Sequence, residues 1–224
     1  HVADLSPENY TPKGYREGIH SAVEAQMVTV IVDSVSHLWD SENGLKSVAE
    51  TTARPTDFGK SWGVAKRGAT AVITDILTVP ANVICTMRAA HIYDNISDPV
   101  TNKKTRVIIG EKPIFAKEFE FEFDVLLEVD GNHNVTVIKA PMLKDKRVLP
   151  CPSVDDWREF FATLGTKSIQ KPVLQQIEDA FASVNSTESL EKAKKFANAN
   201  AKFLPKGSTD TVKKWSVEAT AKYG

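Results

Sequence analysis

The sequence is short of cysteine, of long hydrophobic runs and of net charge, and each shortage excludes a class of protein. Its two cysteines, Cys85 and Cys151, lack CxxC spacing and are too few for a secreted disulfide scaffold, which favours a reducing compartment. Its hydrophobic runs are shorter than about ten residues, whereas a membrane helix needs about 20. The 28 Lys and Arg against 29 Asp and Glu exclude a globally basic nucleic-acid coat, but they allow a local basic loop. We therefore expect a cytoplasmic protein without membrane contact.

The composition that remains is that of an ordinary globular protein. Hydrophobic residues make up 42% of the 224 residues and charged residues 25%, which is enough apolar material for a core without disulfide or metal staples. The length allows one ample domain, or a domain with a small appendage.

The first part of the chain alternates helical and strand-like patterns. Apolar residues at helical spacing follow Thr11 and Pro12, and they predict a helix over 12–25. Two short apolar runs, 27–32 and 82–87, are typical of buried parallel strands, and a helical pattern over 61–78 lies between them. This order predicts an α/β fold with a mostly parallel sheet.

The second part changes character. Residues 91–113 are polar and predict a long loop or a hairpin, and residues 119–129 and 134–139 flank a turn and predict a β-hairpin. We expect the alternating carboxylates of 118–124 to share one face of the first of these strands. From residue 170 the pattern predicts three helices. The expected domains are a core over 1–165 and a helical appendage over 166–224.

Two polar positions follow the predicted buried strands. Asp33 follows the apolar run in VTVIVDS (28–34). This position at the end of a predicted strand indicates the crevice where open α/β sheets bind ligands, although a simple helix cap is an alternative. Thr86 and Arg88 follow the next strand at the same edge, where they are suited to bind a γ-phosphate, with an ordinary surface arginine as the alternative. A Walker A loop, GxxxxGK[ST], is absent, because the Gly59-Lys60-Ser61 triplet has Arg54 where the first glycine is needed.

Four segments together resemble the phage RecA-like nucleotide-binding proteins, AAA-type ATPases associated with single-strand annealing and recombination. These segments are DLSPENY (4–10), VTVIVDSVSHLWD (28–40), TDILTVPANVICTMR (74–88) and EFEFDVLLEVDGNHNVTVIK (120–139). The resemblance implies a RecA-like P-loop NTPase core with a β-hairpin extension. It also implies that the first strand, the P-loop and the first helix would lie before His1, so we expect a core truncated at its N-terminus and nearly inactive as it stands.

The resemblance implies roles for particular residues, cofactors and partners. Asp33 would be the Walker B acid that holds Mg²⁺, with Ser34 beside it, and Thr86 and Arg88 would sense the γ-phosphate of ATP. Lys103, Lys104 and Arg106 would face single-stranded DNA, with plain solvated surface as the alternative. Lys139 would reach a neighbouring subunit, although Ala140 and Pro141 depart from the family pattern there. The implied partners are single-stranded DNA, recombination or single-strand-binding proteins, and further copies of the chain in a bacterial host cell.

Two rival interpretations remain open. The first is a non-catalytic binding or assembly module on the same fold, which exposed apolar surface would favour. The second is a different α/β enzyme in which Asp33, His37 and Arg88 converge in one hydrolytic pocket.

Overall fold

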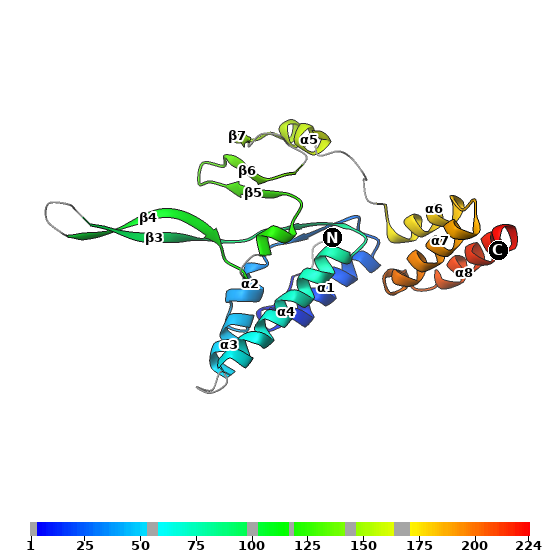
Figure 1. Ribbon diagram of the computed structural model, residues 1–224, viewed down its shortest axis with the longest axis horizontal. Helices are drawn as coiled ribbons and strands as arrows, with labels where there is room; N and C mark the ends of the chain where they lie inside the picture. The colour runs from blue at the N-terminus through cyan, green and yellow to red at the C-terminus, as the bar shows by residue number, and fades with distance from the viewer. Residues whose placement is uncertain (1–3, 53–57, 98–102, 117–118, 142–146, 164–170) are drawn as a thin grey trace. The chain divides into compact units, whose positions relative to one another are not determined.

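The chain divides into two compact units. The computed structural model describes residues 4–52, 58–97, 103–116, 119–141, 147–163 and 171–224 (Figure 1). The first unit is discontinuous and consists of His1–Ala116 and Pro172–Gly224, and the second is Lys117–Lys171. The domain boundary expected near residue 165 falls within 164–170, outside the described residues.

The predicted parallel strands are present in the first unit. A short 3₁₀ helix, η1 (Pro7–Asn9), precedes α1 (Pro12–Glu24), and the Thr11 hydroxyl caps α1 by accepting a bond from the Gly14 N–H at 3.2 Å. Strands β1 (Thr29–Val32) and β2 (Asn82–Cys85) pair in parallel, with Val32 opposite Cys85. Among the described residues this is the one parallel pair, and the fold is mixed α/β with small sheets.

Three helices connect these two strands. They are α2 (Ser36–Asp40), α3 (Leu45–Thr52) and α4 (Phe58–Thr78). Helix α4 packs against α1 and α3, and the buried carboxylate of Asp75 ties it to α1 through Arg16 Nε at 2.7 Å and His20 Nε2 at 2.8 Å. The sheet is covered unevenly: Val30 is buried, whereas Ile31 and Ile84 are adjacent in register and are 66% and 46% exposed.

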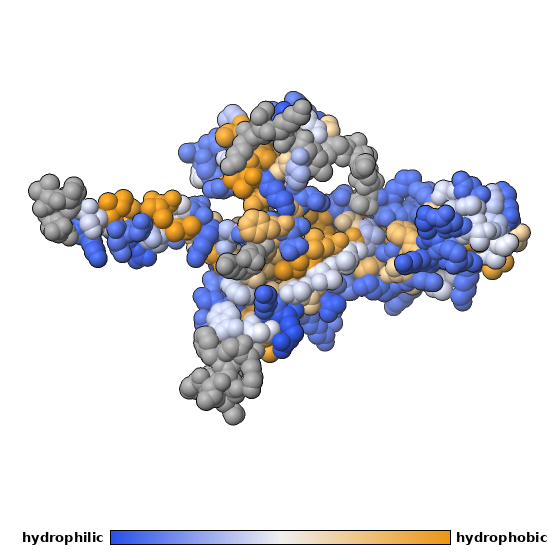
Figure 2. All heavy atoms as spheres, viewed as in Figure 1, coloured by the Kyte–Doolittle hydropathy of each residue, from blue (hydrophilic) through white to orange (hydrophobic). Residues whose placement is uncertain are grey.

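An antiparallel ribbon follows β2 directly. Strands β3 (Ala89–Ser97) and β4 (Lys104–Pro113) pair along their length, with a bulge next to Ile92. Of the two alternatives predicted for 91–113, the described residues therefore fit the hairpin. Most ribbon side chains are exposed, and Figure 2 shows hydrophobic and hydrophilic residues side by side along it. The ribbon therefore has little core of its own.

The second unit contains the other predicted hairpin. Its elements are η2 (Phe119–Glu122), β5 (Leu126–Val129), β6 (Val135–Lys139), β7 (Val148–Leu149) and α5 (Val154–Thr163). Strands β5 and β6 pair around the turn at Asp130, as expected. Hydrogen bonds from the Asn134 side chain and backbone lower the pKa of the Asp130 carboxyl and fix this turn.

The carboxylate-lined strand face expected over 118–124 is wrong. Residues 119–122 form a 3₁₀ helix instead, and the rings of Phe119 and Phe123 meet edge to face at 4.8 Å. Residues four apart lie one turn away from each other in a helix but about 13 Å apart in a strand. The contact between these two rings is therefore compatible with the helical turn and not with the extended strand that the alternating carboxylates predicted.

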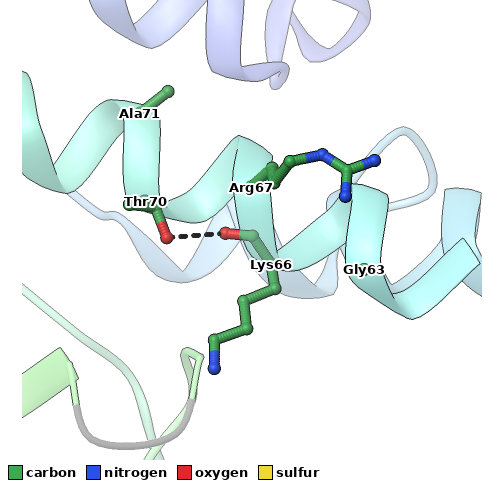
Figure 3. A pocket seen from close by; sticks show the side chains of 5 residues that line it. All are labelled: Gly63, Lys66, Arg67, Thr70 and Ala71. Carbon is green, nitrogen blue, oxygen red and sulfur yellow. Dashed lines mark hydrogen bonds between the residues drawn. The ribbon is translucent and has the colours of Figure 1, made fainter. Parts of the chain in front are cut away.

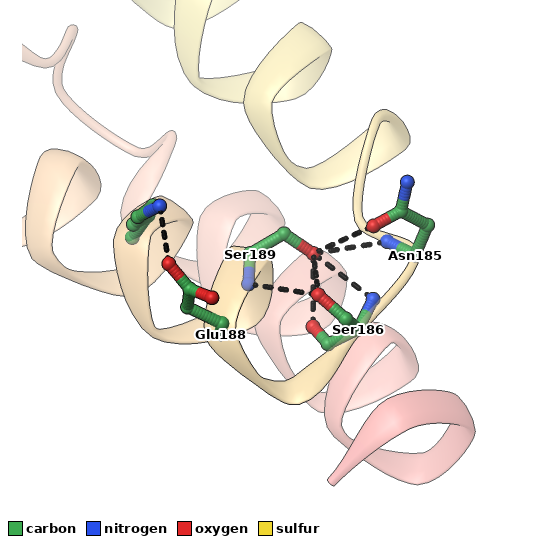
Figure 4. Close-up of polar contacts among 5 residues, drawn as sticks. Asn185, Ser186, Glu188 and Ser189 are labelled. Carbon is green, nitrogen blue, oxygen red and sulfur yellow. Dashed lines mark hydrogen bonds and ion pairs between the residues drawn. The ribbon is translucent and has the colours of Figure 1, made fainter.

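The three helices expected after residue 170 are present, and they belong to the first unit. They are α6 (Val173–Ala182), α7 (Thr187–Ala199) and α8 (Thr209–Tyr223), with η3 (Ala201–Phe203) between the last two. Ser186 and Ser189 form a reciprocal capping box at the start of α7 (Figure 4). Gln26 ties this segment to α1, because it accepts a bond from the Leu174 N–H at 3.0 Å and donates to the Phe203 carbonyl at 3.2 Å. Within the described ranges, no helix is long and apolar enough to cross a membrane.

Candidate functional site

Asp33 and Thr86 meet at the carboxyl edge of the β1–β2 pair. The parallel register continues past both strands, since Thr86 N–H donates to the Val32 carbonyl at 3.0 Å and Val35 N–H donates to the Thr86 carbonyl at 3.1 Å. The Thr86 hydroxyl then donates to Asp33 Oδ1 at 2.5 Å. Both side chains are exposed. The two predicted site residues thus form one hydrogen-bonded pair that solvent can reach.

Ser34 faces away from this edge. It is 6% exposed, its hydroxyl lies 3.2 Å from His37 Nδ1, and the peptide bond between Asp33 and Ser34 is cis. The Ser34 carbonyl accepts a hydrogen bond from the buried Tyr15 hydroxyl at 2.7 Å. Burial raises the pKa of Tyr15 to about 12, so the hydroxyl keeps its proton at neutral pH. Ser34 therefore helps to fix the loop beneath Asp33, and its predicted catalytic role stays a prediction.

Helix α2, which begins three residues after Asp33, holds both strands of the ribbon at their base. The fully buried Ser36 hydroxyl accepts a hydrogen bond from the Arg88 N–H at 2.9 Å, next to the start of β3. The ring of Trp39 packs against Phe115, which follows β4, at 6.0 Å between centroids. The Arg88 carbonyl closes the base by accepting a bond from the Ile114 N–H at 2.8 Å. The ribbon base and the Asp33 edge are thus parts of one packed region.

Arg88 itself differs from Thr86 in its surroundings. Its side chain is exposed, and its described contacts run through its backbone to Ser36 and Ile114, not to Asp33. The structure brings Asp33 and Thr86 together and places Arg88 two residues further along the same strand end. The predicted phosphate-sensing role of Arg88 stays a prediction.

The predicted DNA-binding residues belong to the ribbon, and the predicted subunit-contact residue belongs to the second unit. Lys104 and Arg106 are exposed on β4, and Lys103 directly precedes that strand. The Arg106 guanidinium lies over the Tyr93 ring, 3.9 Å from its centroid. Lys139 belongs to the second unit, where its ammonium donates to the Phe121 carbonyl at 2.7 Å. Their roles stay predictions.

The Asp33–Thr86 edge fits a hard cation such as Mg²⁺ in its donor chemistry. Mg²⁺ binds oxygen, keeps several waters and uses only one or two protein carboxylates. The Asp33 carboxylate is exposed, and Oδ2 has no hydrogen-bond partner among the described residues. The described ranges contain no cluster of three His, Cys, Asp or Glu side chains, which is the arrangement that a zinc or calcium site would need.

The Gly59-Lys60-Ser61 triplet does not form a phosphate loop. All three residues lie in the first turn of α4, where the backbone is helical. Further along α4, Gly63, Lys66, Arg67, Thr70 and Ala71 line a hollow, and the Thr70 hydroxyl donates to the Lys66 carbonyl at 2.9 Å (Figure 3). The hollow involves neither Asp33 nor Thr86.

The rival hydrolytic site requires His37 to act beside Asp33. His37 instead lies at hydrogen-bond distance from Ser34 and stacks on Tyr10 with the ring centroids 5.0 Å apart. These contacts hold the imidazole within the α1–α2 packing.

Sequence reasoning missed Ser36, Trp39 and Tyr93. Nothing in the sequence around Ser36 and Trp39 indicated that Ser36 accepts a hydrogen bond from Arg88 or that the Trp39 ring packs against Phe115. Tyr93 gave no sign of its partner either, because Arg106 lies on the paired strand of the ribbon.

One comparison with known proteins gives a match. The sequence model of the family described as AAA domain matches residues 19–158, more than half of the chain, and this range includes Asp33, Thr86 and the ribbon. No curated protein and no solved structure matches the chain.

Proposed function

The chain belongs to the AAA domain family, and from this premise we propose that it binds ATP with Mg²⁺ at the Asp33–Thr86 edge. The hydrogen bond from the Thr86 hydroxyl to Asp33 at the ends of two adjacent parallel strands carries this proposal. AAA-type domains generally bind nucleotide together with Mg²⁺. The finer proposal is a RecA-like core that handles single-stranded DNA during phage recombination or annealing.

Each residue of the edge has a defined task in this proposal. Thr86 holds Oδ1 of Asp33 and so orients the carboxylate, which leaves Oδ2 for the cation. Bound Mg²⁺ would neutralise phosphate charge there. Residues 1–224 contain no GxxxxGK[ST] loop, so little besides the cation attracts the triphosphate. We therefore expect weak, strictly magnesium-dependent ATP binding and little hydrolysis by these residues.

The ribbon is the proposed DNA-binding element, and its attachment supports coupling to the nucleotide. Strand β3 begins three residues after Thr86. Ser36 and Trp39, on the helix that follows Asp33, contact the two ends of the ribbon base. A shift of the Asp33 loop on nucleotide binding therefore moves both ribbon strands together. A coupling free energy of this kind changes affinity by roughly 5- to 150-fold.

Titration with ATP, in the presence of Mg²⁺ and of EDTA, tests the nucleotide site. We expect Asp33→Asn to weaken magnesium-dependent binding at least about tenfold, because a neutral amide holds the cation poorly. Asp40→Asn is the matched control, since Asp40 is an exposed carboxylate that pairs only with Lys46 among the described residues. The proposal is refuted if the unmodified chain binds no ATP, or if both variants bind ATP equally.

A non-catalytic assembly role is the second candidate. The observation that favours it is the exposure of Ile31 and Ile84 side by side on the β1–β2 pair, because parallel sheets are normally covered on both faces. Sedimentation of the unmodified chain and of Ile31→Ser distinguishes the roles. Assembly predicts an oligomer that the substitution dissociates, together with no response to ATP.

A further inference from the structure

The pairing of β3 with β4 places one aromatic and two basic side chains on the same ribbon face. Directly paired residues share a face, and so do alternate residues along a strand. Tyr93 pairs with Ile108, Asn95 with Arg106 and Ser97 with Lys104, so Tyr93, Arg106 and Lys104 project together. The opposite face carries Asp94, Ile96, Thr105 and Val107. The two faces therefore differ in chemistry.

The Tyr93 ring is held in place although 45% of the residue is exposed. The Arg106 guanidinium lies over its face at 3.9 Å, and the His91 ring meets it nearly perpendicularly at 6.1 Å. His91 Nδ1 in turn lies 3.1 Å from the Glu111 carboxylate across the ribbon. These contacts fix an aromatic ring and a planar cation in a stacked arrangement before any ligand binds.

The basic residues on this face form no ion pair with a carboxylate within the described ranges. Lys104 and Arg106 have no carboxylate partner in the part of the chain that the structure describes. Exposed cations elsewhere commonly have one, as in the pairs Lys46–Asp40, Arg158–Asp155 and Lys192–Glu188. The Tyr93 face thus offers positive charge beside a stacked π system at the end that carries Arg106 and Lys104, whereas Glu111 lies beside His91 towards the other end. The basic end suits a flexible polyanion with exposed aromatic rings.

We propose that Tyr93 and Arg106 form a stacking platform for an unpaired base of a single-stranded nucleic acid. The inference rests on the proposed function, in which the ribbon carries DNA, and it names the residue that recognises the base. The base extends the stack that the Tyr93 ring and the Arg106 guanidinium already form, and the adjacent phosphates bind Arg106 and Lys104. A duplex binds less well, because its bases are already stacked on one another. Every base has a π face, so the platform discriminates little between bases.

An abasic strand separates stacking from charge. Fluorescence anisotropy is measured with a labelled oligothymidine of about twelve nucleotides and with an abasic strand of equal length, with and without Mg²⁺ and ATP. Tyr93→Leu keeps the apolar bulk but removes the ring, Tyr93→Phe keeps the ring, and Thr105→Ala alters the opposite face. Far-UV circular dichroism and thermal unfolding check that each variant folds like the unmodified chain.

We expect Tyr93→Leu to weaken oligothymidine binding roughly tenfold, and abasic-strand binding less than about twofold. Tyr93→Phe and Thr105→Ala keep both affinities within about twofold. The platform is refuted if Tyr93→Leu binds oligothymidine normally, if it weakens both strands equally, or if the unmodified chain binds neither strand. If oligothymidine binding depends on Tyr93 but not on ATP or Asp33, the platform stands and the proposed nucleotide coupling fails.

Discussion

Replacing Tyr15 by phenylalanine removes one buried hydroxyl beneath the candidate site. The hydroxyl donates to the Ser34 carbonyl at 2.7 Å, and the His37 N–H reaches the same carbonyl only at 3.4 Å. A buried acceptor that loses its better donor costs roughly 1–3 kcal/mol, and the remaining weak bond puts this site near the lower end. We therefore expect Tyr15→Phe to lower the free energy of unfolding by about 1 kcal/mol at pH 8.

The difference in the free energy of unfolding between the unmodified chain and Tyr15→Phe should disappear as the pH rises. Burial raises the folded-state pKa of Tyr15 from 10.0 to about 12. Below pH 10 the Tyr15 hydroxyl keeps its proton in both the folded and the unfolded state, so its full contribution to stability is present. Above it the unfolded state releases the proton first, and stability is lost until the pH passes the folded pKa. At pH 10.5 this loss amounts to about 0.8 kcal/mol for the unmodified chain and to nothing for Tyr15→Phe.

Urea unfolding of both chains at pH 8, 9.5 and 10.5, followed by circular dichroism, measures this difference. Titration of the other tyrosines and of the lysines is common to both chains and cancels in the comparison. Equal stabilities at pH 8 would refute the hydrogen-bond argument. A difference that stays constant to within about 0.3 kcal/mol up to pH 10.5 would refute the argument from burial.

Two further predictions concern other parts of the chain. Burial raises the pKa of the Cys85 thiol to about 12, whereas Cys151 is exposed, so iodoacetamide at pH 8 should modify Cys151 first. Mass spectrometry of the peptides that contain Cys85 and Cys151 measures which thiol is modified first, and faster modification of Cys85 would contradict the prediction. Gln26→Ala removes the bonds to Leu174 and Phe203, so limited proteolysis of α6–α8 should become several-fold faster. An unchanged rate would show that these bonds do not hold the segment.

The parts of the fold that were predictable depend on neighbouring residues. Thr11 and Pro12 mark the start of α1, and the structure confirms both signals. The β1–β2 pair followed from two apolar runs separated by a helix, because such a crossover brings parallel strands together. Contact between Asp33 and Thr86 followed from the same rule, since carboxyl ends of parallel strands share one edge.

The parts that were not predictable depend on distant partners. Tyr93 meets Arg106 only because of the ribbon register, which a bulge next to Ile92 shifts by one residue. The carboxylates of 118–124 alternate as in a strand, yet residues 119–122 form a 3₁₀ helix in which Phe119 is buried and its ring meets that of Phe123, because packing of the rings outweighs a weak local preference. The spacing of apolar and polar residues in the sequence does not show that Tyr93 meets Arg106 or that Phe119 meets Phe123.

The discontinuity of the first unit determines when that unit can finish folding. Gln26 and the Phe203 carbonyl that it binds are 177 residues apart. A ribosome that adds about 5–20 residues per second needs roughly 9 to 35 seconds to synthesise that stretch. During this interval the nascent α1 lacks the contacts that Leu174 and Phe203 provide, and the whole of Lys117–Lys171 emerges first. The helices α6–α8 can therefore close the first unit only after the whole second unit has been synthesised.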